Sequence, residues 1–162
     1  MTTHPTLRTL FKIGCVNAER IFKERGEISP MWHAVPEDGE HLLIATPWED
    51  DDEKVIAIEF LRREFKRLKV MRFVFIVEAW VVRMPEQVAT NEAGPPWPRP
   101  SEHPDRREVV KIQAEDRDGS ALSGMYYILR PEHGPATLSP FHEDHFTSVA
   151  GRMTGLLVRT RH

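Results

Sequence analysis

Glu78 is the residue whose setting most favours chemistry, because it lies inside the most apolar run of the chain, residues 70–84. Burial among apolar neighbours raises the pKa of a carboxyl group and suits it to general acid or base catalysis. Such catalysis needs a second group, and His33, His41 and Tyr126 are the candidates, although their spacing brings none of them near Glu78. A small hydrolase or lyase that uses Glu78 is therefore one functional hypothesis.

Two pairs of histidines have spacings that occur in metal sites. His33 and His41 fall on opposite arms of a predicted hairpin and could face each other, and His142 and His145 would share a face if their segment were helical. Neither pair matches an established metal signature such as His-Glu-x-x-His, and two ligands do not complete a site. We therefore predict no metal and no cofactor.

Charged residues gather at the two ends of a predicted helix that ends near Lys69. Asp50, Asp51 and Asp52 at its start could ligate a metal, and its basic second half could bind phosphate. Both clusters also complement the helix dipole, which favours negative charge in the first turn and positive charge in the last, so one cause explains both. Nucleic-acid binding is a third functional hypothesis and would use Arg62, Arg63, Lys66, Arg67, Lys69 and Arg72.

The composition is typical of a globular protein and narrows the functional classes. With 162 residues, of which 40% are hydrophobic and 29% charged, the chain can form one domain with its own core. The net charge of −3 argues against strong, sequence-independent binding to nucleic acid. The apolar run is too short for a membrane-spanning helix. The single Cys15 cannot form an internal disulfide and the N-terminus lacks a signal peptide, so we expect a cytoplasmic protein.

Two amphipathic helices are predicted from apolar residues at spacings of three and four. The first covers residues 5–25, with Gly26 as its C-terminal cap, and Cys15 on its buried face is expected to be a small core residue rather than a nucleophile. The second begins either at Thr46 or on one of the following aspartates. The apolar positions are Leu7, Phe11, Cys15, Ala18 and Phe22 in the first helix, and Ile58, Leu61, Phe65 and Leu68 in the second.

Alternating apolar residues and turn signals predict the strands. Residues 31–35 and 41–46 form a hairpin around a Pro-x-Asp-Gly turn, residues 71–83 form a long central strand, and residues 107–115 and 125–130 form a second hairpin. Residues 136–138 are expected to add a short edge strand. The second face of the central strand mixes apolar and charged groups, and with its neighbours it is predicted to carry Val74, Ile76, Glu78, Trp80, Val109, Lys111, Tyr126 and Ile128.

Two segments are expected to be irregular. Residues 85–106 contain six prolines and must form a long loop, in which Trp97 and Arg99 belong to a stretch of polyproline-II character. Such a loop could bind an aromatic groove or cross the sheet and pin Trp97 to it. For the C-terminal tail at residues 147–162, a flexible segment, a marginal helix and a partner-bound segment all stay open.

These elements predict a single α+β domain over residues 1–162, in the order α-β-β-α-β-β-β. The sheet should be mostly antiparallel, with about five or six strands and both helices packed on one face. The other face is too apolar to be left bare, so we expect a second copy, another protein or the proline-rich loop to cover it. The leading functional hypothesis is thus a non-catalytic interaction or ligand-binding protein, as a homodimer or with a partner, in which Lys111 or Arg130 faces Glu78.

Overall fold

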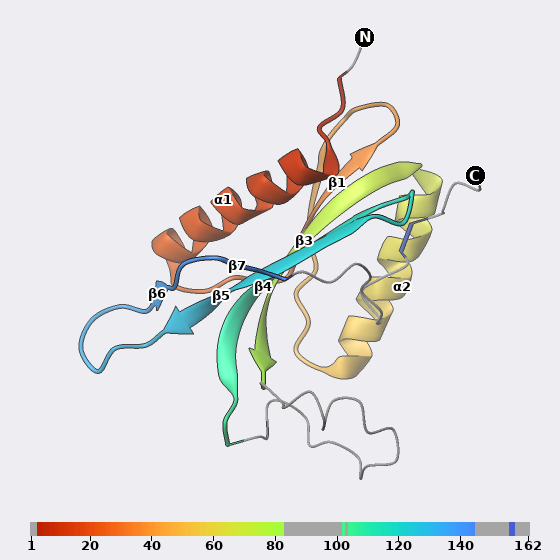
Figure 1. The fold of residues 1–162 in the computed structure, drawn as a ribbon. Helices are drawn as coiled ribbons and strands as arrows, with labels where there is room; N and C mark the ends of the chain where they lie inside the picture. The colour runs from red at the N-terminus through yellow and green to blue at the C-terminus, as the bar shows by residue number, and fades with distance from the viewer. Residues whose placement is uncertain (1–2, 83–101, 103, 145–155, 158–162) are drawn as a thin grey trace, which may run out of the picture.

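The computed structural model describes residues 3–82, 102, 104–144 and 156–157. The fold is α+β, as predicted, with two helices and an antiparallel sheet (Figure 1). In chain order the elements are α1 (Leu7–Arg25), β1 (Met31–Pro36), β2 (Leu42–Ala45), α2 (Asp51–Arg67), β3 (Val70–Val81), β4 (Arg107–Asp116), β5 (Ala121–Leu129), β6 (Thr137–Leu138) and β7 (His142–Asp144). Neither helix in these ranges is long and apolar enough to cross a membrane.

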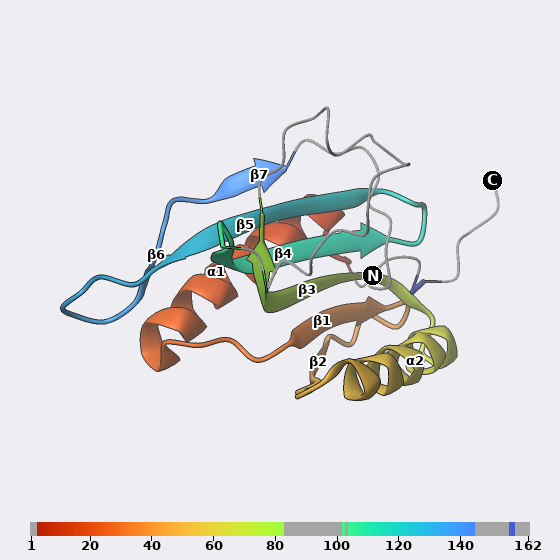
Figure 2. The same cartoon turned by 90° about the horizontal axis from the view of Figure 1, so that it is seen from below.

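The sheet has seven strands in the described part of the chain, slightly more than predicted. Six of them lie in the order β2-β1-β3-β4-β5-β6, and β7 also pairs with β5 (Figure 2). The predicted central strand is β3, which pairs with β1 on one side and with β4 on the other. Both predicted hairpins form, and Gly39 (φ 81°) and Gly119 (φ 95°) supply the left-handed residues of their turns.

Both helices begin at a side-chain cap. Thr6 Oγ1 accepts a hydrogen bond from the Thr9 N–H at 3.1 Å, and Asp50 Oδ1 accepts one from the Glu53 N–H at 2.8 Å. These caps satisfy amide groups that have no partner within the helix. The second helix therefore starts after the first aspartate, and Asp50 acts as a cap. Gly26 ends α1 in a left-handed conformation (φ 73°), as predicted.

The two helices pack on opposite faces of the sheet, which corrects the prediction that both lie on one face. Gly14 of α1 lies against Val74, whereas Phe65 of α2 contacts Phe73 with ring centroids 5.4 Å apart. Adjacent residues of a strand point to opposite faces, so these contacts place the helices on either side of β3. Figure 1 shows the sheet between α1 on the left and α2 on the right. We call the two sides the α1 face and the α2 face.

The register between β3 and β4 also corrects the predicted faces of β4. Val110 pairs with Glu78 and Lys111 pairs with Val77, so Lys111 lies on the α2 face and is not the cross-strand partner of Glu78. Val109 lies on the α2 face for the same reason. The phase of β4 is ambiguous in the sequence because Val109 and Val110 are adjacent, both apolar, and both fully buried.

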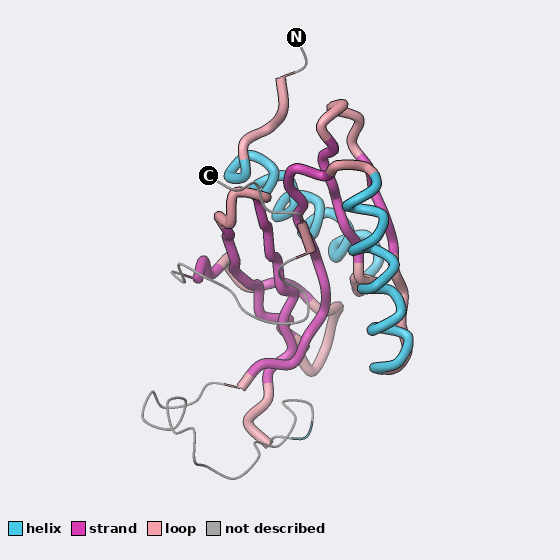
Figure 3. Tube along the Cα trace, turned by 90° about the vertical axis from the view of Figure 1, so that its right-hand side faces the viewer, coloured by secondary structure: helices cyan, strands magenta, loops and turns pink. Residues whose placement is uncertain are grey.

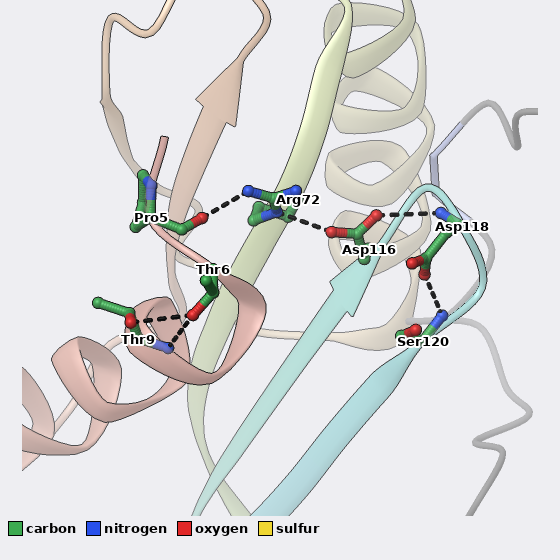
Figure 4. A network of polar contacts seen from close by, with 7 residues as sticks. All are labelled: Pro5, Thr6, Thr9, Arg72, Asp116, Asp118 and Ser120. Carbon is green, nitrogen blue, oxygen red and sulfur yellow. Dashed lines mark hydrogen bonds and ion pairs between the residues drawn. The ribbon is translucent and has the colours of Figure 1, made fainter. Parts of the chain in front are cut away.

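Arg72 joins three segments near the start of β3 (Figure 4). Its Nε donates to Asp116 Oδ2 at 2.7 Å, and its Nη1 donates to the carbonyl of Pro5, just before α1. Asp116 Oδ1 in turn accepts a hydrogen bond from the Asp118 N–H at 3.0 Å, within the turn between β4 and β5. The Arg72 side chain is only 19% exposed. It therefore holds the fold together at this end of the sheet and contributes little to a basic surface.

After β5 the chain forms the short strand β6, as predicted, and then β7, where a helix was considered. His142 pairs with Met125 in the ladder between β5 and β7, so it lies in a strand and not in a helix. His145 lies outside the described residues. Phe141 contacts the rings of Phe11 and Tyr126 at centroid distances of 5.7 and 5.0 Å, which ties this segment to the α1 face.

Most of the predicted proline-rich loop, including Trp97 and Arg99, and most of the C-terminal tail lie outside the described residues. Two residues of the tail, Leu156 and Leu157, are described. They are buried in the apolar cluster of the α2 face, which also contains Trp32, Phe73 and Phe75.

Candidate functional site

The predicted binding face is the α1 face, and helix α1 of the same chain covers most of it. Val74, Ile76, Tyr126 and Ile128 are at most 8% exposed and belong to one apolar cluster with α1. The Tyr126 hydroxyl donates to Glu19 Oε1 on α1 at 2.6 Å, and burial together with this hydrogen bond raises the pKa of Tyr126. These four residues are therefore core residues, and the cover that the face needs is α1.

Glu78 lies on the same face and holds the segment that follows α1. Its Oε1 accepts a hydrogen bond from the Ile28 N–H at 2.8 Å. Burial raises the pKa of Glu78, while this hydrogen bond and the positive charge of Arg130 act in the opposite direction. The candidate catalytic partners make other contacts, since Tyr126 binds Glu19 and His33 binds His41. The described contacts of Glu78 thus support a structural role.

His33 and His41 face each other across the hairpin of β1 and β2, as the sequence suggested. Nε2 of His33 lies 2.7 Å from Nδ1 of His41. Burial, and then the neighbouring His41, lowers the pKa of His33. The residues of the described ranges contain no group of three or more His, Cys, Asp or Glu side chains that could hold a metal ion. The pair therefore lacks the third ligand that a metal site would need.

The basic second half of α2 is partly neutralised by the helix itself. Arg67 forms an ion pair with Glu64 at 2.7 Å, and Arg62 lies 3.7 Å from Glu59. Each pair links residues three positions apart on the exposed side of α2, where such contacts contribute little to stability. This arrangement gives less support to a phosphate-binding surface than the sequence alone did.

The far end of β3, β4 and β5 extends past the pairing of β1, which stops at Ile76. It carries two stacks of arginine on an aromatic ring. The Arg106 guanidinium carbon lies 5.0 Å from the ring centre of Trp80, and that of Arg107 lies 5.6 Å from the ring centre of Tyr127. The strand register places Trp80 on the α1 face and Tyr127 on the α2 face.

A hollow of about 520 Å³ adjoins the second stack on the α2 face. Arg107, Tyr127 and His142 line it together with Val81 and Asp105. The His142 ring meets the Tyr127 ring edge to face, with centroids 5.3 Å apart. A second hollow of about 540 Å³ shares Arg107 and Tyr127 and extends along the end of β5. We call the group Val81, Asp105, Arg107, Tyr127 and His142 the open end.

The open end combines hydrogen-bond donors with apolar walls. Arg107 presents a planar guanidinium that matches the geometry of a carboxylate or phosphate, and its contact with Tyr127 restricts its orientation. His142 adds a ring nitrogen, and Val81 and the Tyr127 ring provide apolar surface. Asp105 also lines the hollow and already interacts with another group of the protein. The arrangement can therefore bind a small molecule that carries an anionic group.

Sequence reasoning identified His142 only as a metal candidate and did not select Arg107 or Tyr127. Two adjacent arginines, Arg106 and Arg107, at the start of a strand beside a long loop were the available signal. The pairing that brings Arg107 to Tyr127 depends on the register of β4 and β5, which a single sequence does not define.

Comparisons with protein-family models, with curated proteins and with solved structures gave no match. The chemistry of the open end therefore carries the functional proposal.

Proposed function

We propose that this protein is a non-catalytic binding protein whose open end receives a small anionic ligand with a flat apolar part. The stack of Arg107 on Tyr127 beside His142, at the wall of a hollow of about 520 Å³, carries this proposal. The volume falls within the range of roughly 300–1,000 Å³ that is usual for small-molecule sites. The anionic group would bind Arg107 and His142, and the apolar part would lie along Tyr127 and Val81.

Glu78 does not belong to this site. It lies on the α1 face of β3, whereas Val81 and Tyr127 line the hollow from the α2 face. A hydrolase or lyase built on Glu78 stays as the alternative, supported by the raised pKa of that carboxyl. The two functions are separable, because a Glu78→Gln variant would lose turnover under the alternative but would keep ligand binding under our proposal.

We also propose that the protein is located in the cytoplasm. Cys15 is a free thiol, and burial raises its pKa to about 11. A thiol of this kind is largely protonated at neutral pH and reacts slowly, which is compatible with the reducing cytoplasm.

Isothermal titration calorimetry with phenyl phosphate, benzoate and inorganic phosphate tests the proposal. We expect at least one of these anions to bind, with neutral benzyl alcohol much weaker. Arg107→Gln should weaken binding about tenfold to a hundredfold, because a hydrogen bond to a charged group contributes about 1.5–3 kcal/mol. Arg117→Gln is the matched control, since Arg117 pairs with Glu37 at the opposite end of β4.

Two results would contradict the proposal. One is an absence of heat from every anion in the panel at millimolar concentration. The other is equal binding by the native protein and the Arg107→Gln variant, which would place the anion elsewhere. Release of phenol from phenyl phosphate would show catalysis and would favour the hydrolase.

A further inference from the structure

Helix α2 carries a second row of residues along its outer side, apart from the row that packs on the sheet. Ile58, Leu61 and Phe65 are buried against the α2 face. The outer row has spacings of three and four residues and consists of Glu53, Ile56, Phe60, Arg63 and Arg67, all of them exposed. Ile56 is 70% exposed and Phe60 is 48% exposed, and Figure 3 shows α2 along the outside of the molecule. We call these five residues the outer stripe.

The outer stripe has an exposed apolar pair, Ile56 and Phe60, between charged residues, as the seam between two packed helices does. Apolar residues at spacings of three and four form the seam of an antiparallel or parallel helix pair, and flanking charges select the orientation. The apolar centre of the stripe is Ile56 and Phe60. An acidic residue, Glu53, lies on one side of this centre, and the basic residues Arg63 and Arg67 lie on the other.

The charge order is self-complementary in only one orientation. If two copies of α2 pair antiparallel about a twofold axis midway between residues 56 and 60, Ile56 meets Phe60 of the second copy and Glu53 meets Arg63. Each contact occurs twice, because the interface is the same on both copies. A parallel pair would instead place Glu53 beside Glu53 and Arg63 beside Arg63. Glu53 Oε2 accepts a hydrogen bond from the Glu49 N–H, and a carboxylate can accept further bonds through its second oxygen.

We propose that the outer stripe binds a second copy of this chain, with the two α2 helices antiparallel. The occupant is a second copy because the stripe complements itself in apolar contact and in charge. The interface is distinct from the open end and independent of the proposed ligand. It also replaces the α1 face as the self-association surface, since α1 of the same chain covers that face.

Sedimentation velocity over a wide concentration range tests this interface with four variants. We expect a reversible dimer that Phe60→Glu weakens about a hundredfold or more, because the substitution acts twice at the centre. Val16→Glu is the matched control: Val16 is 63% exposed on α1, and its replacement should leave the dimer unchanged. Glu53→Arg and Arg63→Glu should each weaken the dimer, since each creates two like-charge contacts.

The charge variants also test the orientation. The double variant Glu53→Arg/Arg63→Glu should restore the dimer, and an equimolar mixture of the two single variants should form a heterodimer. Circular dichroism of each variant checks that α2 is folded. A native protein that stays monomeric at millimolar concentration would overturn the proposal. So would a dimer that tolerates Phe60→Glu, or a double variant as weak as the single ones.

Discussion

A methyl group added at Gly14 tests directly whether α1 packs on β3 as described. Gly14 is a buried residue in the middle of α1. A Cβ atom at this position would lie 2.6 Å from Val74 Cγ2 and 3.3 Å from Val74 Cγ1. Both distances are shorter than an ordinary contact between carbon atoms, so the helix, the strand or the Val74 side chain must shift. Gly14→Ala is thus the smallest substitution that overpacks the contact between the two elements.

Two opposing effects determine the result. Alanine is a better helix former than glycine by about 1 kcal/mol, so the substitution would stabilise an isolated or exposed helix. Overpacking of a buried contact costs about 1–3 kcal/mol, and the distance of 2.6 Å favours the upper part of this range. We therefore expect Gly14→Ala to lower the free energy of unfolding by about 1–2 kcal/mol. The sign of the change is the informative quantity.

A double-mutant cycle isolates the contact. Val74→Ala removes both Cγ atoms and leaves Val74 Cβ at 3.5 Å, which is an ordinary contact distance. In that background Gly14→Ala should become neutral or stabilising, so the two substitutions should couple by about 2 kcal/mol. Urea unfolding followed by circular dichroism gives all four free energies. The packing of α1 on β3 would be refuted if Gly14→Ala stabilised the otherwise native protein, or if the two effects were additive.

Four further predictions concern individual side chains. Glu78→Gln should flatten the dependence of stability on pH above about pH 4.5. The raised pKa of Glu78 gives a contribution to stability that is present below this pH and lost as the pH rises through the folded pKa. His33→Gln should flatten the dependence of stability on pH below about pH 6.5. The lowered pKa of His33 gives a contribution to stability that is present above this pH and lost as the pH falls through the folded pKa. Urea unfolding at several pH values measures the effects of both substitutions. Cys15 should react slowly with iodoacetamide at pH 8 in the folded protein and rapidly in urea, as mass spectrometry would show, because its pKa is about 11. Gly124→Ala should lower the free energy of unfolding by about 2–3 kcal/mol in the same urea assay, since a Cβ would lie 2.8 Å from the backbone carbonyl oxygen of His142 as well as 2.2 Å from Phe141 Cζ.

The elements were predictable from sequence because each depends on a local pattern. Spacings of three and four located α1, Gly26 located its end, and the turn at Gly39 located the first hairpin. The long apolar run at residues 70–84 identified β3 as the central strand. The second face of this strand was expected to be covered by a second copy, another protein or the proline-rich loop, whereas α1 of the same chain covers it. Its apolar residues on both sides are typical of a strand that is buried on both faces.

The predictions that were wrong or missing concern features that depend on contacts between distant segments of the chain. Tertiary packing decides which face of the sheet each helix covers. The apolar stripe of a helix fits either face here, because the central strand is apolar on both faces. The faces of β4 were ambiguous because Val109 and Val110 are both apolar and adjacent. Lys111 or Arg130 was therefore expected to face Glu78, whereas Lys111 pairs with Val77. The open end brings Arg107, Tyr127 and His142 together through two separate strand pairings, each of which would have had to be predicted in register.

The position of the bound anion is the most direct test of the functional proposal. A titration of the ¹⁵N-labelled protein with phenyl phosphate, followed by two-dimensional NMR, reports which backbone amides sense the ligand. We predict saturable shifts centred on Arg107, Tyr127 and His142, which are retained in Arg117→Gln but need about tenfold to a hundredfold more ligand in Arg107→Gln. Shifts centred on the His33–His41 pair or on the basic half of α2, with Arg107 and Tyr127 unmoved, would contradict the assignment of the open end as the binding site.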